Sequence, residues 1–322
     1  MAIFNLGTGV LGFLGACVLN GFIYYQIKRH IMTDLASMQY VSSMLRCCDK
    51  ICSIKMSCEE SEIQTLKQYY QVFRSLRGKI PNTFKTSFSD ADFLGEYTKI
   101  IFMSDLRHYN AAIKKITAHK EEFHALYRQL GEIDMAISLL SFRKSIPFYT
   151  KPVFTENNEI IFEELYHPLL EKPVTNNGHI DKDSIVTGSN ASGKSTFIKA
   201  LAVNGILAQT LYTCMAKKFV LQNSLIVTSM AVKDDITAGD SYFITEIKSL
   251  KRILDCTAEI HCNCFIDEIL KGTNTIERIA ASAAVMRYLH ETNCLCMVAS
   301  HDIELTELLK SDYANYHFSE QI

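Results

Sequence analysis

The sequence predicts an all-α helical domain followed by an α/β domain with a largely parallel sheet. Three observations lead to this fold class. Apolar residues recur at helical spacing between residues 31 and 145. After Pro147 and Pro152, short apolar runs alternate with helical stretches, which is typical of α/β domains. One of these runs leads directly into a glycine-containing loop at residues 188–196.

The first element is an apolar segment, residues 2–25, that carries no charge and is followed by Lys28, Arg29 and His30. A stretch of this length can span a bilayer with its basic flank on the cytoplasmic side. It can equally be a helix buried in the protein or at a dimer contact, and the sequence leaves both interpretations open. A cleaved secretion signal is disfavoured, because no basic residue precedes the run. We therefore separate residues 1–30 and expect a cytoplasmic protein, membrane-associated under the first interpretation.

The second element is the helical domain, predicted over residues 31–148. Leu35 and Met38, and later Ile133 and Ile137, recur at spacings that place them on one face of a helix. Charged residues fall between the apolar ones, as on a solvated helix face. The residues of this domain therefore have the pattern of packed helices.

The third element is the α/β domain, predicted over residues 149–322. Its expected strands are residues 160–162, 184–187, 219–221, 225–228, 262–266 and 294–299. Helical stretches separate several of these runs, and such alternation favours parallel strands joined by crossover helices.

Composition limits the function classes. Apolar residues make up 48% of the chain, which is ample for a globular core and argues against disorder. The formal net charge is −2, with 33 basic and 35 acidic residues. Such a chain has no overall electrostatic attraction to nucleic acid, although a local basic strip would still permit binding.

The loop at residues 188–196 fits the phosphate-binding pattern G-x-x-x-x-G-K-[ST] in full, between a buried strand and a helix. The fold is therefore expected to be of the P-loop NTPase class. Main-chain N–H groups of such a loop point at phosphate oxygens, Lys194 reaches the β- and γ-phosphates, and the Ser195 hydroxyl is a ligand of Mg²⁺. The predicted nucleotide-binding residues are Gly188, Ser189, Asn190, Ala191, Ser192, Gly193, Lys194, Ser195 and Thr196.

Two further strand ends supply acids and a histidine. The strand at 262–266 ends in Asp267 and Glu268. Asp267 is expected to hold the Mg²⁺ shell beside the loop, and Glu268 to polarise the attacking water. The strand at 294–299 ends in Ser300, His301 and Asp302. At this strand end, His301 could sense the γ-phosphate or orient water. Alternatively, the segment serves as a helix cap and His301 has no role of its own. The spacing alone leaves both interpretations open.

Taken together, these pieces resemble the ATPase domain of the DNA mismatch repair MutS family, over about residues 166–318. The motifs that carry the resemblance are YHPLL at 166–170, TGSNASGKST at 187–196, GDSYF at 239–243 with Glu246, DEILKGTNT at 267–275, SHD at 300–302 and NYHF at 315–318. They look most like the shorter MutS-related proteins of bacteria. Residues 31–145 resemble part of the family's lever or core domain.

The resemblance implies a Mg²⁺-dependent ATPase that works as a dimer through this domain. Ser241 of one subunit would act in trans on ATP held by the other, and His317 would lie near the adenine. The aromatic residue that the family places beside adenine is not evident at residues 173–176. The family pattern also continues beyond Ile322, so the domain is expected to be incomplete at its C-terminal end.

Three functions are compatible with these features. The first is a MutS-like ATPase with ATP-dependent DNA binding in mismatch repair or recombination. The second is a membrane-associated ATP-driven switch, anchored by residues 2–25, without a DNA role. The third, a non-catalytic ATP-binding scaffold, is disfavoured because both reactive positions, Glu268 and His301, are filled.

Overall fold

The computed structural model describes residues 2–54, 61–78, 98, 100–189, 192–230 and 242–319. Contacts divide the chain into two compact units, Met1–Ser138 and Leu139–Ile322. The division falls inside one helix, α6 (Lys120–Ser145), and the predicted boundary at 148/149 follows the end of that helix. The sequence-based domain limits themselves stay a prediction.

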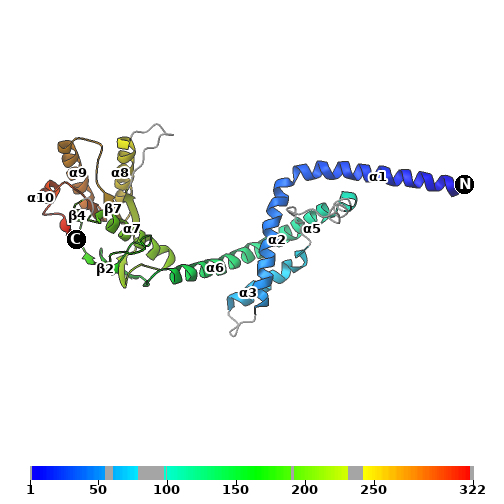
Figure 1. Ribbon diagram of the computed structural model, residues 1–322, viewed down its shortest axis with the longest axis horizontal. Coiled ribbons are helices and arrows are strands. Elements are labelled where there is room, and N and C mark those ends of the chain that lie inside the picture. The colour runs from blue at the N-terminus through cyan, green and yellow to red at the C-terminus, as the bar shows by residue number, and fades with distance from the viewer. Residues whose placement is uncertain are drawn as a thin grey trace. The chain divides into compact units, whose positions relative to one another are not determined.

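The first unit is helical, as predicted (Figure 1). Besides the start of α6 it contains α1 (Ala2–His30), α2 (Met32–Ser53), α3 (Ser61–Phe73), the 3-10 turn η1 (Arg74–Leu76) and α5 (Ser104–Ala118). Its core is a cluster of buried side chains: Met38, Leu45, Cys48, Leu66, Tyr70, Phe73, Leu76, Ala112 and Leu126. Among the side chains that the structure describes, none from α1 belongs to this cluster. The helical unit therefore has a core built from α2, α3, η1, α5 and α6.

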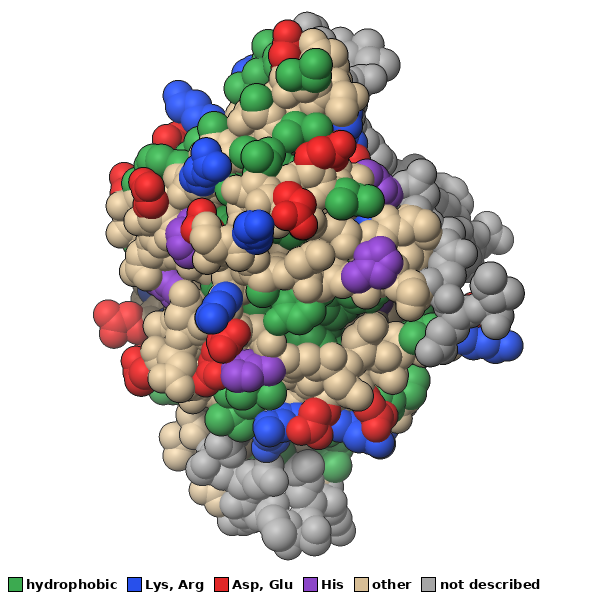
Figure 2. Space-filling model, turned by 90° about the vertical axis from the view of Figure 1, so that its left-hand side faces the viewer, with side chains coloured by type: hydrophobic (Ala, Val, Ile, Leu, Met, Phe, Trp, Pro, Cys, Tyr) green, Lys and Arg blue, Asp and Glu red, His purple; other side chains and the backbone are tan. Residues whose placement is uncertain are grey.

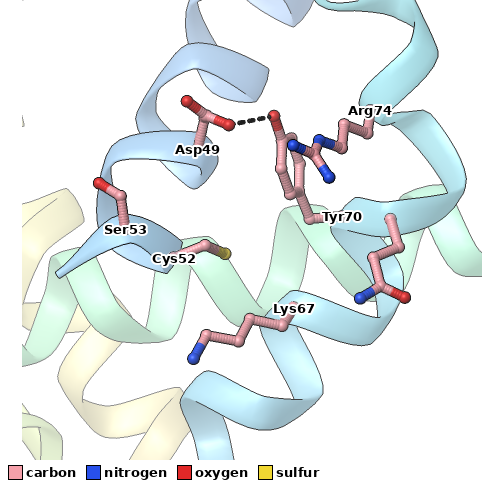
Figure 3. A pocket seen from close by; sticks show the side chains of 7 residues that line it. Asp49, Cys52, Ser53, Lys67, Tyr70 and Arg74 are labelled. Carbon is pink, nitrogen blue, oxygen red and sulfur yellow. Dashed lines mark hydrogen bonds between the residues drawn. The ribbon is translucent and has the colours of Figure 1, made fainter. Parts of the chain in front are cut away.

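A pocket of about 290 Å³ lies between α2 and α3 in this unit (Figure 3). Its lining is polar: Asp49, Cys52, Ser53, Lys67, Tyr70, Gln71 and Arg74. Tyr70 donates a 2.8 Å hydrogen bond to Asp49, and Arg77 forms a 2.7 Å ion pair with the same carboxylate. Burial, together with this hydrogen bond, raises the pKa of Tyr70 to about 12. Asp49 on α2 thus binds both Tyr70 on α3 and Arg77. The pocket belongs to a different unit from the phosphate loop.

The second unit contains two sheets. A four-stranded sheet has the order β1-β5-β2-β3, and a five-stranded sheet has the order β6-β7-β8-β4-β9. All pairs in the five-stranded sheet are parallel, whereas β2 runs antiparallel to both of its neighbours. The strands are β1 (Val153–Thr155), β2 (Ile160–Leu165), β3 (Asn176–Ile180), β4 (Ser184–Gly188), β5 (Lys218–Gln222), β6 (Leu225–Ser229), β7 (Cys262–Asp267), β8 (Cys294–Ala299) and β9 (Ala314–Phe318). The predicted α/β class with a largely parallel sheet is confirmed.

Helices cover both faces of the five-stranded sheet. Helix α7 (Lys194–Leu211) belongs to a core that also takes residues from β2, β3 and β5, so it lies between the two sheets. Helices α8 (Tyr242–Glu259), α9 (Thr275–His290) and α10 (Glu304–Leu308) belong to a second core on the other face. Strand β8 is buried along its whole length, as expected for a parallel strand covered on both sides. This layering brings the carboxyl ends of β4, β7 and β8 to one edge.

Candidate functional site

The predicted phosphate loop connects β4 to α7, and two glycines explain its path. Gly188 has φ +143°, and a Cβ there would lie 2.4 Å from the Phe318 carbonyl oxygen. Gly193 has φ +90°, a conformation that residues with side chains rarely adopt. The Phe197 N–H then donates to the Gly193 carbonyl at 2.9 Å, which begins the helix. The loop therefore turns sharply and presents the N-terminus of α7 at the end of the sheet, where an anion is favoured.

Lys194 is only 4% exposed and lies inside this loop. Its Nζ donates to the carbonyl oxygens of Gly188 and Ser189, at 2.6 Å to the latter. Burial lowers the pKa of the ammonium group, while the nearby charges of Glu268 and Asp267 act in the opposite direction. The Lys194 ammonium group is thus held inside the loop, close to Asp267 and Glu268 at the end of β7. Asn190 and Ala191, which were predicted to belong to this loop, lie outside the described residues.

The structure brings the two predicted metal ligands together. Ser195, in the first turn of α7, donates a 2.8 Å hydrogen bond to Asp267 Oδ1 at the end of β7. These residues are 72 positions apart in the chain. A hydroxyl and a carboxylate at this distance are the hard oxygen ligands that Mg²⁺ prefers, so the residues present fit the ion.

Glu268 and His301 also meet, although they come from different strands. His301 Nε2 lies 2.8 Å from Glu268 Oε1, and Lys271 Nζ lies 3.3 Å from Glu268 Oε2. Glu268 has φ +64°, in the left-handed region that costs free energy for a residue with a side chain. Its N–H donates to the Ala299 carbonyl at 3.0 Å, which holds the end of β7 against the end of β8. This geometry turns the Glu268 carboxylate toward the segment that carries His301.

One pair beside the site was not found from the sequence. Arg278 of α9 forms a bidentate ion pair with Asp302, with Nε–Oδ2 and Nη2–Oδ1 distances of 2.8 and 2.6 Å. The side chains are 25% and 12% exposed, and the hydrogen bond to Asp302 raises the pKa of Arg278. Asp302 follows His301 directly, so the pair fixes the segment that carries this histidine. The sequence signal is Asp302 itself, which follows His301 in the SHD motif, but the sequence does not indicate its partner.

Of the three remaining residues, the structure describes His317 and Glu246 but not Ser241. His317 is exposed on β9, where its Nδ1 lies 3.1 Å from the Thr187 hydroxyl, one residue before the loop begins. Ser241 lies outside the described residues. Glu246 is 2% exposed on α8 and accepts a 3.2 Å hydrogen bond from the Lys271 N–H. The helix that follows the predicted signature segment therefore contacts the segment that follows Glu268.

Charges of both signs are interspersed on the face of the molecule in Figure 2. Among the side chains that this view shows and the structure describes, no large area carries a single sign. This distribution agrees with the net charge of −2. A broad basic surface for nucleic acid is thus not a feature of this face.

Comparison with known proteins identifies the domain. Residues 184–321 match the family model of MutS domain V. MutS protein homolog 4 of Homo sapiens is 32% identical over 227 residues, which cover 66% of this chain and 24% of that protein. The DNA mismatch repair protein MutS of Pseudothermotoga lettingae is 34% identical over 190 residues, which cover 56% of this chain and 23% of that protein.

The chain spans about a quarter of the length of these relatives. The matched region begins with β4 and contains the loop, both acidic strand-end residues and His301. The resemblance to the MutS family predicted from the motifs is therefore confirmed: residues 184–321 match MutS domain V, an ATPase domain, and the chain is similar to MutS-family proteins over about a quarter of their length.

Proposed function

We propose that this chain binds ATP together with Mg²⁺ at the carboxyl ends of β4, β7 and β8 and hydrolyses it. The observation that carries the proposal is the contact between Ser195 and Asp267, 2.8 Å apart. It joins the phosphate loop to the acidic strand end, and one cation can bind both oxygens only if they lie this close. The buried Lys194 beside them supplies the positive charge that a triphosphate requires.

Each residue has a defined task in this proposal. The loop N–H groups and Lys194 bind the phosphates, and Lys194 exchanges its bonds to the loop carbonyls for bonds to phosphate oxygens. Mg²⁺, when bound, neutralises charge that develops on the phosphate oxygens. Glu268 accepts a proton from the attacking water, and His301, 2.8 Å away, orients the carboxylate. Both groups are in place at strand ends that the sheet fixes.

We further propose that two copies close on the nucleotide. The family resemblance assigns Ser241 to a segment that reaches ATP held by a second subunit. The bond from the Lys271 N–H to Glu246 supports a link between that segment and the catalytic one. It connects α8, which begins one residue after Ser241, to the turn that follows Glu268. ATP would then hold the two subunits together, and hydrolysis would release them.

The proposed setting is ATP-dependent DNA binding in mismatch repair or recombination. One relative is named a DNA mismatch repair protein, and the matched region is the domain shared with it. This chain covers about a quarter of that relative, and DNA binding is therefore proposed for this chain rather than taken from the comparison. Binding that weakens steeply with salt would support this setting, and salt-independent or absent binding would argue against it.

The test of the catalytic proposal is the Glu268→Gln variant. It should retain ATP affinity, because the loop, Lys194 and the metal ligands are untouched, while turnover falls by about a hundredfold or more through loss of the base. ATP binding is measured by equilibrium titration and hydrolysis by phosphate release, each with Mg²⁺ and with a chelator. The matched control is Glu259→Gln at the end of α8, which removes the same charge and should change neither quantity. Undiminished hydrolysis by Glu268→Gln would remove this residue from the mechanism.

A further inference from the structure

Helix α1 exposes large apolar side chains on all of its faces. Val10, Leu11, Phe13, Leu19 and Ile23 are between 36% and 71% exposed. Successive residues of an α-helix are rotated by about 100°, so these five positions point in widely different directions around the axis. The segment Gly9–His30 is long and apolar enough to cross a membrane, and only 6% of its most apolar 18-residue stretch is buried. A helix that is hydrophobic all round needs an apolar environment on every side.

The part of α1 that does pack against the helical unit is its polar side. Asn20 donates a 3.0 Å hydrogen bond to the Ile101 carbonyl, and Tyr24 is 1% exposed and lies 3.5 Å from Asp105. Lys28 donates a 3.1 Å hydrogen bond to the Tyr24 hydroxyl. A soluble helix does the reverse, because it buries its apolar stripe and exposes its polar one. Among the described side chains of α1, these contacts lie in its C-terminal half, from Asn20 onward.

We propose that α1 spans a lipid bilayer, with the end that carries Lys28 and Arg29 at the cytoplasmic surface. The helix has 29 residues, and a bilayer core of about 30 Å requires about 20 apolar residues. The uncharged run of residues 2–25 supplies them. The basic pair follows immediately and matches the anionic cytoplasmic leaflet. The ATPase domain then lies on the side of the membrane where ATP is abundant.

Two other environments fit the exposed surface less well. A helix that lies in the membrane surface needs one polar face along its length, and α1 has none between Gly9 and Leu19. A second copy of the chain would cover one stripe of α1 and leave the opposite apolar side chains in water. Only lipid surrounds a helix on every side.

The contacts with the helical unit also indicate where the bilayer ends. Phe102 is 64% exposed and directly follows Ile101, the residue that accepts the bond from Asn20. An aromatic side chain at this level suits the boundary between hydrocarbon and headgroups. The hydrocarbon core would therefore end near Asn20 and Phe102. Residues 21–25 would cross the headgroup layer to the basic pair, and the core of the helical unit would lie outside the lipid.

The test uses the full chain, expressed in cells and reconstituted into vesicles of phosphatidylcholine and phosphatidylglycerol. The wild type should stay with membranes through an alkaline carbonate wash and float with the vesicles. The double variant Leu14→Arg/Val18→Arg should leave the membrane fraction, because each arginine near the centre of a span shifts insertion by about a hundredfold. The matched control is Met32→Arg/Tyr40→Arg on α2, where both residues are exposed apolar positions outside the proposed span and should tolerate the charges.

Each outcome decides the proposal. Unchanged ATP affinity shows that the ATPase domain of every variant is folded, since neither α1 nor α2 contributes to the nucleotide site. Release of the wild type by carbonate would mean that α1 binds only at the membrane surface. A lipid-free dimer cross-linked through α1 would mean that a second copy covers the helix. Either result would overturn the proposal that α1 spans the bilayer. In inside-out vesicles prepared from the expressing cells, whose outer face is the cytoplasmic one, added protease should digest the ATPase domain. Protection of that domain would overturn the orientation.

Discussion

Helices α7 and α1 are both rich in apolar residues, yet the molecule places them in opposite surroundings. In α7, Phe197, Ile198, Leu201 and Ala208 are at most 8% exposed, because a sheet lies on each side. In α1, Phe13, Leu14 and Val18 are at least 55% exposed. The polar end of α7 faces the nucleotide site, whereas the polar side of α1 faces protein.

The difference shows that apolar composition alone does not determine what covers a helix. The strands that cover α7 come from several parts of the second unit, so its environment depends on sheet topology. No strand lies in the first unit among its described residues, and the core there closes without α1. The same kind of helix thus becomes the support of a site in one unit and a candidate membrane span in the other.

The largest expected effect compares two phenylalanines, one on each helix. Phe197→Ala should lower the free energy of unfolding by about 3–5 kcal/mol, because a buried aromatic side chain leaves a cavity. Its ring contacts those of Phe162 and Phe318, at centroid distances of 5.7 and 4.9 Å. Phe13→Ala should change unfolding in detergent by less than about 0.5 kcal/mol, as exposed positions usually do.

Chemical denaturation measures both variants, followed by a probe in the second unit for Phe197→Ala and by a probe in the first unit for Phe13→Ala. Phe197→Leu is the control for volume, and its cost should stay below about 1.5 kcal/mol. A large loss of stability in Phe13→Ala would break the comparison, because it would mean that protein covers α1.

The next effect concerns the polar end of α7. Lys194→Ala should weaken ATP binding by about a hundredfold, since two charge-assisted hydrogen bonds to phosphate are lost. Lys199→Ala, on the same helix and five residues further on, removes an equal charge and should leave affinity within about twofold. Equilibrium titration with a fluorescent ATP analogue separates the two variants. Equal weakening by both would mean that only the net charge of the helix matters.

The sequence predicted the five central strands and missed three of the four strands at sheet edges, since β6 is the one edge strand that was expected. The expected strand at residues 294–299 coincides with β8, whose six residues are all buried and apolar. The strands β1, β3 and β9 were not among the expected ones, and each lies at the edge of a sheet. Edge strands have one unpaired side and exposed residues, as the polar run Asn176–Ile180 shows. Hydrophobic patterning therefore detects the centre of a sheet better than its rim.

The candidate site divides in the same way. The loop and the acids at residues 267–268 could be predicted because strand, turn and helix follow one another within a short stretch of chain. Arg278 could not, because its partner Asp302 is 24 residues away and the pairing depends on how α9 packs beside β8. The left-handed backbone of Glu268 was equally hidden, since it results from the bond of its N–H to Ala299. Contacts that the sheet creates are invisible to a local pattern.

The smallest expected effect extends the comparison to a third helix, α9, which touches the site through a side chain rather than through its end. Asp302→Asn should lower turnover by about tenfold, roughly 1.4 kcal/mol in the activation barrier, because His301 loses its fixed position. ATP affinity should stay within about twofold, since neither partner belongs to the phosphate loop. Phosphate release and nucleotide titration measure the two quantities separately.

A double-mutant cycle distinguishes positioning from a general loss of structure. If Arg278 and Asp302 act as one unit, Arg278→Gln/Asp302→Asn should lose no more turnover than either single variant. Arg287→Gln on the same helix is the control, because its side chain bonds the Leu308 carbonyl away from the strand end. Additive losses in the cycle, or an equal loss in the control, would mean that α9 only supports the fold. A coupled loss confined to turnover would show that α9 affects catalysis through the Arg278 side chain. Helix α7, by contrast, contributes its N-terminus to the site.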